Sequence, residues 1–225
     1  SRVVEEKNTS SIEYVHHLNW SGEHNASDLY SFINQSKLFY PNAFHQVWDR
    51  DAIEHFMEER VTDEIKGLYR QLKVRELHYL RMQLVSYCIL YAKGGLCLSE
   101  SIQCLNNMDP KPGTRLIAFR SEHGDDGLPG LNVVDEMIFS RKGVLEIKMA
   151  IDIVADYFKD VIGSDVKKNQ GLNDSAKVSP LSKAMAIRFD TSAYEVGEKV
   201  SVSHKQGCSP SYFYISPDGK ILGVV

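Results

Sequence analysis

The sequence lacks a long apolar run, a block of basic residues and any closely spaced pair of cysteines. Its most apolar stretch, 84–92, is interrupted by Ser86 and is far shorter than the roughly 18 residues that span a bilayer, so we expect no membrane span within this chain. The 26 basic residues are outnumbered by 30 acidic ones, which gives a net charge of −4. This mildly acidic balance argues against nucleic acid as a partner.

Several catalytic and metal-binding signatures are also missing. The four cysteines show neither a Cys-x-x-Cys pair nor a cysteine–histidine ligand spacing, which disfavours a structural zinc site; they are Cys88, Cys97, Cys104 and Cys208. There is no Gly-x-Ser-x-Gly hydrolase motif, no P-loop and no Gly-x-Gly-x-x-Gly dinucleotide motif. The residue pattern by itself identifies no catalytic residue.

Acceptor tripeptides for N-glycosylation, in contrast, are frequent. Five Asn-x-Ser/Thr sites occur, at Asn8, Asn19, Asn25, Asn34 and Asn173, where chance predicts roughly one for this content of Asn, Ser and Thr. The excess favours a secretory-pathway lumen. Polar segments also produce such tripeptides readily, so the lumen and the cytoplasm both remain open.

Strand-like and helix-like patterns alternate, which indicates an α/β fold in a single domain over residues 1–225. Residues 1–11 are expected to be a flexible N-terminal segment, and 200–225 a C-terminal strand and hairpin. Buried strands are predicted at 12–18, 44–48, 96–98, 116–119 and 137–139, and helices at 28–37, 51–60, 74–93, 144–158 and 180–189. The longest helix has an apolar residue every three or four positions and ends at Gly94-Gly95, which tolerate left-handed backbone.

Residues 82–101, MQLVSYCILYAKGGLCLSES, form a helix, Gly-Gly and strand block that resembles the core of the DXD-containing glycosyltransferase family. That family includes mannosyltransferases, α-1,4-glycosyltransferases, bacterial capsular enzymes and the clostridial glucosylating toxins. Its pattern is a helix of the type S-D-x-x-R-Y-x-x-L-Y-x-x-G-G followed by a strand that ends in D-x-D. Weaker similarities flank this block at residues 14–20 (the family's opening strand), 47–49 (its L-W-D element) and 178–181 (its T-G-P loop).

The resemblance implies a GT-A-like fold with a central mixed sheet flanked by helices. It also implies transfer of a sugar from a UDP- or GDP-linked donor to a glycan or protein acceptor, with Mn²⁺ or Mg²⁺ as cofactor. Trp20 stands near the family's base-binding position, so it either stacks on the nucleotide base or packs as an ordinary core aromatic. His204 stands where many GT-A enzymes carry a metal-ligating histidine, although the sequence around it differs.

Four polar positions depart from the family pattern. This chain has Gln83 and Ser86 where the family has the aspartate and arginine that contact the nucleotide sugar, and Ser99 and Ser101 where it has the two metal-binding aspartates. Divalent cations are recruited by carboxylates, and a neutral serine hydroxyl is a weak ligand, so metal binding is doubtful here. Glu100 is the only acid of the triplet, and strand alternation would project it to the opposite face.

Three interpretations follow from these departures. The first is a glycosyltransferase homologue with a degenerate donor site and little or no activity, which acts as a binding or scaffolding partner of an active paralogue. The second is an active transferase that holds its donor without a metal. The third is an unrelated, non-enzymatic α/β binding domain. We favour the first, because losing four charged contacts removes most of the electrostatic stabilisation that a departing diphosphate needs.

Overall fold

The computed structural model describes residues 10–21, 26–121, 132–163, 178–188, 190–202 and 211–225. His204, Cys208 and most of the expected flexible N-terminal segment therefore lie outside the described residues. None of the helices in the described part of the chain combines the length and apolarity that crossing a bilayer requires.

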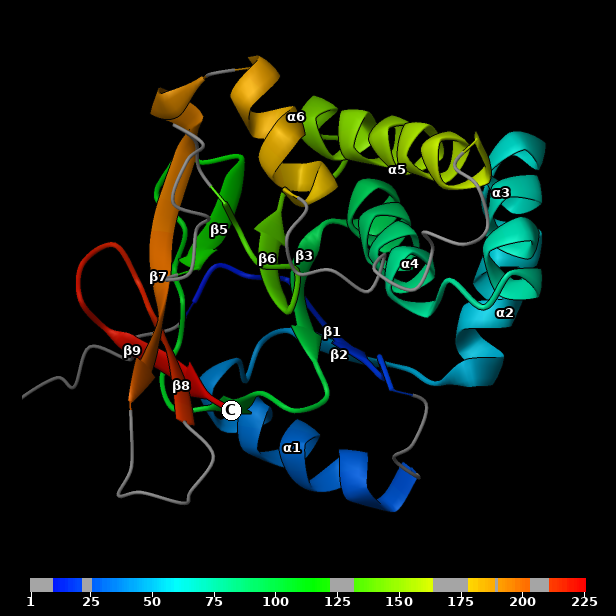
Figure 1. The fold of residues 1–225 in the computed structure, drawn as a ribbon. Helices are drawn as coiled ribbons and strands as arrows, with labels where there is room; N and C mark the ends of the chain where they lie inside the picture. The colour runs from blue at the N-terminus through cyan, green and yellow to red at the C-terminus, as the bar shows by residue number, and fades with distance from the viewer. Residues whose placement is uncertain (1–9, 22–25, 122–131, 164–177, 189, 203–210) are drawn as a thin grey trace, which may run out of the picture.

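The described strands form one mixed sheet in the order β2-β1-β3-β6-β5-β7-β8-β9-β4 (Figure 1). Strands β2, β1 and β3 are parallel neighbours, β6 runs antiparallel between β3 and β5, and β5 pairs in parallel with β7. The strands are β1 Tyr14–Leu18, β2 Phe44–Trp48, β3 Gly95–Ser99, β4 Gln103–Cys104, β5 Leu116–Ser121, β6 Met137–Ser140, β7 Tyr194–Val202, β8 Ser211–Ile215 and β9 Ile221–Val224.

Helices cover both faces of this sheet. Figure 1 shows α2 to α6 gathered on one side and α1 on the other. The helices are α1 Ala26–Phe39, α2 Arg50–Glu59, α3 Asp63–Val74, α4 His78–Lys93, α5 Leu145–Gly163 and α6 Pro180–Arg188. The predicted α/β class, with a mixed sheet flanked by helices, is confirmed.

Several predicted boundaries were wrong, among them the end of the helix predicted at 144–158, which continues to Gly163. The helix expected at 74–93 begins only at His78, as α4, because Glu76 adopts a positive φ of 56° between α3 and α4. Helix α3 itself was not predicted, although Thr62 caps it by accepting a hydrogen bond from the Ile65 backbone NH. Strand β7 begins at Tyr194, six residues before the C-terminal region in which strands were expected.

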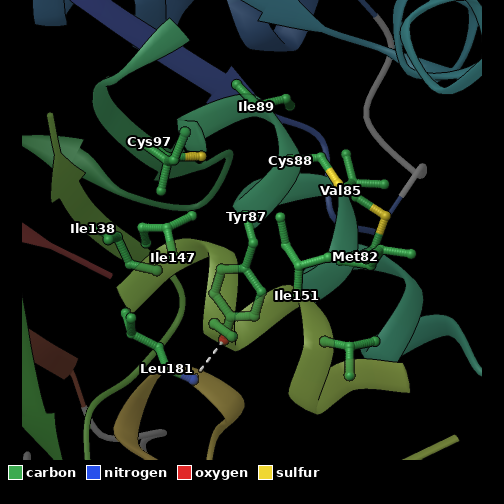
Figure 2. Packing of buried hydrophobic residues seen from close by; sticks show 14 of the residues in the cluster. Met82, Val85, Tyr87, Cys88, Ile89, Cys97, Ile138, Ile147, Ile151 and Leu181 are labelled. Carbon is green, nitrogen blue, oxygen red and sulfur yellow. Dashed lines mark hydrogen bonds between the residues drawn. The ribbon is translucent and has the colours of Figure 1, made fainter. Parts of the chain in front are cut away.

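Helix α4 lies at the centre of the larger apolar core and positions the candidate site. Every residue from Met82 to Leu90 is buried, because α4 packs against β3 and β6 of the sheet and against α3 and α5. Figure 2 shows Tyr87 among Ile138, Ile147 and Leu181. Burying a large aliphatic side chain contributes roughly 1.5–3 kcal/mol, so this packing fixes α4 firmly against β3.

Gly94 and Gly95 connect α4 directly to β3, as their sequence predicts. Both have positive φ, 67° and 108°. A Cβ atom on Gly95 would lie 2.5 Å from the Tyr14 carbonyl oxygen, and one on Gly94 would lie 2.7 Å from the Lys142 backbone nitrogen. The pair therefore permits two close backbone approaches in addition to ending the helix.

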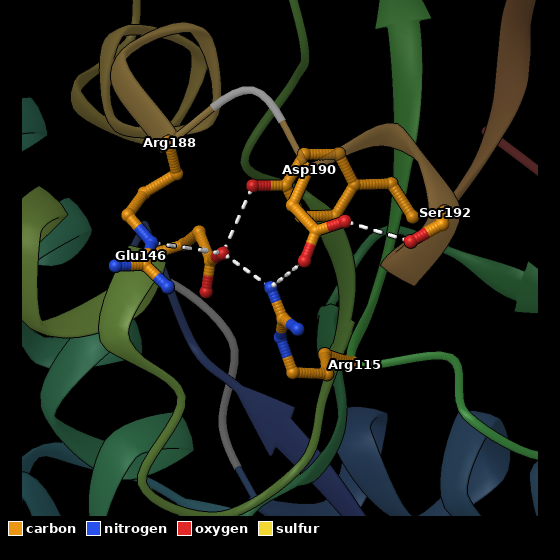
Figure 3. A network of polar contacts seen from close by, with 6 residues as sticks. Arg115, Glu146, Arg188, Asp190 and Ser192 are labelled. Carbon is orange, nitrogen blue, oxygen red and sulfur yellow. Dashed lines mark hydrogen bonds and ion pairs between the residues drawn. The ribbon is translucent and has the colours of Figure 1, made fainter.

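A buried carboxylate ties the α5–α6 layer to the sheet (Figure 3). The side chain of Glu146, in α5, has no exposed surface, and its Oε1 accepts hydrogen bonds from Arg115 (2.8 Å), Tyr194 (2.9 Å) and Arg188 (3.5 Å). Arg115 also pairs with Asp190 at 3.0 Å. Burial alone would raise the pKa of Glu146, but the hydrogen bonds, chiefly that from Arg115, lower it.

Candidate functional site at the carboxyl end of β3

The carboxyl ends of β1 and β3 meet at one edge of the sheet. Leu18 pairs with Ser99, and the Glu100 backbone NH donates to the Leu18 carbonyl at 3.1 Å. The amino end of β6 also reaches this edge, because β6 is antiparallel to β3 and the Ser99 NH donates to the Glu136 carbonyl at 2.8 Å. Ligands of open α/β sheets bind beyond strand carboxyl ends, so this edge is the candidate site.

Ser99, Glu100 and Ser101 lie where the family resemblance places the metal-binding triplet. The Oγ atoms of Ser99 and Ser101 are 3.0 Å apart. The strand ends at Ser99, so alternation does not carry Glu100 to the opposite face as expected; its Oε2 lies 3.5 Å from the Ser99 Oγ. The Glu100 carboxylate accepts hydrogen bonds from the backbone NH groups of Trp20 (2.8 Å) and Ser21 (3.0 Å). Glu100 therefore orders the segment that follows β1.

Gln83 projects from α4 onto a buried acid. Its Nε2 donates to Asp135 Oδ2 at 2.7 Å, the Tyr87 hydroxyl donates to Oδ1 at 2.5 Å, and the Tyr79 hydroxyl to Oδ2 at 3.5 Å. Asp135 is only 2% exposed. Burial raises its pKa to about 6, although these hydrogen bonds act in the opposite direction.

Ser86 does not join this polar cluster. It is completely buried one turn along α4, and its Oγ donates to the Gln83 carbonyl at 2.9 Å. An arginine at this position would have to be accommodated inside the packed core. The structure thus brings Ser99, Glu100 and Ser101 together with Trp20, and Gln83 together with Asp135, while Ser86 bonds only to its own helix.

Trp20 is half-buried at the rim of this edge. Its ring lies 5.5 Å from the ring of Tyr79 at an angle of 56°, and its backbone carbonyl accepts a hydrogen bond from His78. The Trp20 Nε1 is buried and has no hydrogen-bond partner among the described residues. Stacking on a nucleotide base, expected from the resemblance, stays a prediction.

Comparison with known proteins addresses the fold. No family model and no curated protein matches the sequence. A solved structure named PaToxG Glycosyltransferase aligns with a TM-score of 0.52 at 14% identity, over 83% of this chain and 74% of that chain. The fold is glycosyltransferase-like. At this identity the similarity concerns the fold and carries no residue roles.

The sequence did not point to Asp135 or to the ion pair between Glu136 and Lys199. In this pair, Glu136 Oε1 and Lys199 Nζ are 3.0 Å apart. One signal was present, since an Asp-Glu pair directly precedes the strand predicted at 137–139. Its position beside Ser99 depends on β6 being antiparallel to β3, which a single sequence does not specify. Lys199 lies on β7, which was not predicted at that position.

The donor atoms at this edge do not suit a divalent cation. Ser99 and Ser101 offer neutral hydroxyl groups, while protein donors already engage Glu100, Asp135 and Glu136. Mg²⁺ and Mn²⁺ prefer carboxylate and phosphate oxygens that are available to them. Among the described residues, no group of three or more His, Cys, Asp or Glu side chains is placed to hold a metal ion.

The described cysteines are poor nucleophiles. Cys88, Cys97 and Cys104 are free thiols buried in the core, and burial raises the pKa of each to about 12. The thiolate is the reactive form, and it is scarcely populated at neutral pH when the pKa is so high. These three residues therefore serve packing.

Proposed function

We propose that this chain is a glycosyltransferase-like domain with a degenerate donor and metal site, which has reduced or no transfer activity. Such a domain would act as a binding or scaffolding partner, for example of an active paralogue. The observation that carries this proposal is how the carboxylates near Ser99 and Ser101, those of Glu100, Asp135 and Glu136, are hydrogen-bonded. Glu100 and Asp135 accept hydrogen bonds from protein donors on both carboxylate oxygens, which leaves them poorly available to a metal–diphosphate complex. Glu136 Oε1 pairs with Lys199, and its Oε2 is buried and has no partner among the described residues.

Electrostatics support this interpretation. Transfer from a nucleotide sugar leaves a diphosphate whose growing negative charge must be stabilised by cations or aligned donors. Asp135 instead adds a buried acid to this end of the fold, and the Gln83 amide bonds to that acid. Two serine hydroxyls do not replace the charge that a bound divalent cation would supply.

One observation favours a second candidate, a transferase that holds its donor without a metal. The Trp20 Nε1 lacks a partner among the described residues, and the neighbouring Tyr79 is 54% exposed. The exposed part of such an aromatic pair can stack on a uracil or guanine ring. The donor would then be a UDP- or GDP-sugar, and the acceptor a glycan or a protein.

Calorimetric titration with UDP-glucose and GDP-mannose, with and without Mn²⁺, separates the two candidates. For the parent chain we expect Mn²⁺ to change nucleotide-sugar affinity by less than about tenfold, equivalent to roughly 1.4 kcal/mol. The Ser99→Asp/Ser101→Asp variant should gain Mn²⁺-dependent binding, because it restores two carboxylates at the strand end. Ser99→Asn/Ser101→Asn is the matched control, with similar added volume and no charge.

The outcomes point in different directions. Mn²⁺-dependent binding by the aspartate variant alone supports a degenerate donor site. Tight binding by the parent that is unchanged by Mn²⁺ supports the metal-independent transferase. An increase in the parent's affinity of more than tenfold with Mn²⁺ contradicts the degenerate site.

A further inference from the structure

A cavity of about 530 Å³ lies at the opposite edge of the sheet, at the amino end of β3. Its walls come from the segment that leads into β1, the end of α4, Gly94-Gly95 and the turn that follows β6. The volume is within the range of roughly 300–1,000 Å³ that is typical of small-molecule sites. Because Gly95 and Ser99 are four residues apart on an extended strand, this cavity is about 13 Å from the candidate donor site.

Cations dominate the lining of this cavity. Lys93, Arg141 and Lys142 contribute to its walls, and Glu13 is the one acid among the lining residues. No carboxylate in the described residues forms a salt bridge with any of the three cations, although the chain has a net negative charge. The carbonyl groups at the end of α4 can stabilise Lys93, which is in the last turn, but they do not account for Arg141 and Lys142.

The backbone holds this cationic group in place. Gly94 allows the turn at Arg141 and Lys142 to pack directly on the end of α4, closer than any side chain would permit. The Arg141 Nε donates to the Thr114 carbonyl at 2.9 Å, and its guanidinium lies over the Phe139 ring at 5.7 Å. An arginine anchored through Nε presents its remaining NH groups in a fixed direction, which lowers the entropy cost of binding an anion.

We propose that this cavity binds a small anion that carries phosphate groups. Three neighbouring cations without a salt bridge among the described residues repel one another, and a multiply charged anion relieves that repulsion while accepting hydrogen bonds from the guanidinium and ammonium groups. The site is independent of the donor site at the other end of β3. Two sources share this chemistry: a soluble phosphorylated molecule and a phosphorylated lipid headgroup.

The probes are inorganic pyrophosphate, measured by calorimetry at low ionic strength, and phosphatidylcholine vesicles with and without phosphatidylinositol 4-phosphate, measured by co-sedimentation. The Lys93→Glu/Lys142→Glu variant should lose at least tenfold in affinity, because it replaces two cations of the cavity with acids. Both lysines are exposed and neither has a salt bridge among the described residues, so the variant should fold like the parent. Lys159→Glu/Lys183→Glu, on the exposed surfaces of α5 and α6, carries the same charge change and should bind like the parent. Raising the salt concentration should weaken binding by the parent.

The binding site is located from the changes in backbone amide chemical shifts that pyrophosphate causes in the NMR spectrum of the parent. Pyrophosphate should shift Gly94, Gly95 and Ser140, and leave Ser99 and Ser101 unchanged. Loss of binding in the Lys93/Lys142 variant supports the proposal, and the probe that binds identifies the soluble or the lipid source. The proposal is overturned if the parent binds neither probe, if the double variant binds within threefold of the parent, or if the shifts centre on Ser99 and Ser101. Metal-dependent nucleotide-sugar binding at Ser99 and Ser101 would instead contradict the degenerate donor site and leave this inference intact.

Discussion

At the scale of single residues, Gln83 and Asp135 have to be considered as a pair. The family resemblance predicts an aspartate where this chain has Gln83. In the structure its amide donates to a buried carboxylate whose pKa is raised to about 6 by burial. An aspartate at position 83 would therefore place two carboxylates in contact, so the residue at position 83 and the acid at position 135 are physically linked.

We expect Gln83→Asp to lower the free energy of unfolding at pH 7 by about 3 kcal/mol or more, since a buried acid loses its donor and gains a like charge. The loss should be smaller at pH 5, because a carboxyl group with a raised pKa favours the folded state only when it is protonated. Urea denaturation at the two pH values measures this. Asp135→Asn in the same chain should recover most of the loss at pH 7, and an additive result for the two substitutions would refute the pairing.

At the scale of elements, Glu146 joins α5 to α6, β7 and the start of β5. Glu146→Ala should destabilise the fold by about 1–3 kcal/mol, because the Tyr194 hydroxyl loses its buried acceptor, whereas Arg115 is about a third exposed and keeps its ion pair with Asp190. Asp152→Ala is the matched control. It breaks only the exposed Lys148–Asp152 pair of α5 and should cost less than about 0.5 kcal/mol. Equal thermal unfolding of the two variants would contradict a structural role for the network.

The junction between α4 and β3 gives a second prediction at this scale. Gly95→Ala should lower stability by about 2–4 kcal/mol, because φ is 108° and the added Cβ would meet the Tyr14 carbonyl at 2.5 Å. Gly143→Ala has similar backbone strain at a φ of 72° but open space around the Cβ, so about 1 kcal/mol is expected. Chemical denaturation distinguishes them. If Gly95→Ala lowers stability no more than Gly143→Ala, the close approach of β1 does not restrict the side chain allowed at position 95.

At the scale of the whole molecule, stability should depend on two buried histidines. Burial lowers the pKa of His16 to about 4 and that of His17 to about 3, and the neighbouring His45 adds to the second shift. Below pH 6.5 the unfolded chain takes up protons at these residues and the folded chain does not, so stability falls with pH by up to about 1.4 kcal/mol per unit for each group. Asp135, whose pKa is raised to about 6, opposes this between about pH 4 and 6.

Urea unfolding between pH 7.5 and 4.5 tests this balance. The parent should lose stability as the pH falls, and His17→Asn should flatten the dependence because one proton-binding difference is removed. Asp135→Asn should steepen it, because the opposing group is gone. Identical pH slopes for all three proteins would show that these side chains do not titrate differently in the folded and unfolded states.

The whole fold also shows which helices, strands and site residues the sequence could predict. Periodicity located most of the helices and strands, because apolar spacing is a local property: the strand at 44–48 and the hairpin at 212–225 are found as expected. The candidate site was only partly predictable. Ser99 and Ser101 were singled out by the family resemblance, whereas Asp135 reaches Gln83 through the antiparallel placement of β6, and Lys199 reaches Glu136 through the position of β7. Such pairings join distant segments, and local patterns do not encode them.

The pairing of β9 with β4 has a consequence for the order of events during synthesis. Gln103 and Cys104 pair with Val224 and Gly223, about 120 residues later in the chain. A ribosome adds about 5–20 residues each second, so β9 is synthesised about 6–24 s after β4. Throughout that interval the nascent protein carries an unpaired strand edge, which is a site for mispairing with other chains. Chaperone protection of the emerging chain would therefore matter most between the synthesis of these two strands.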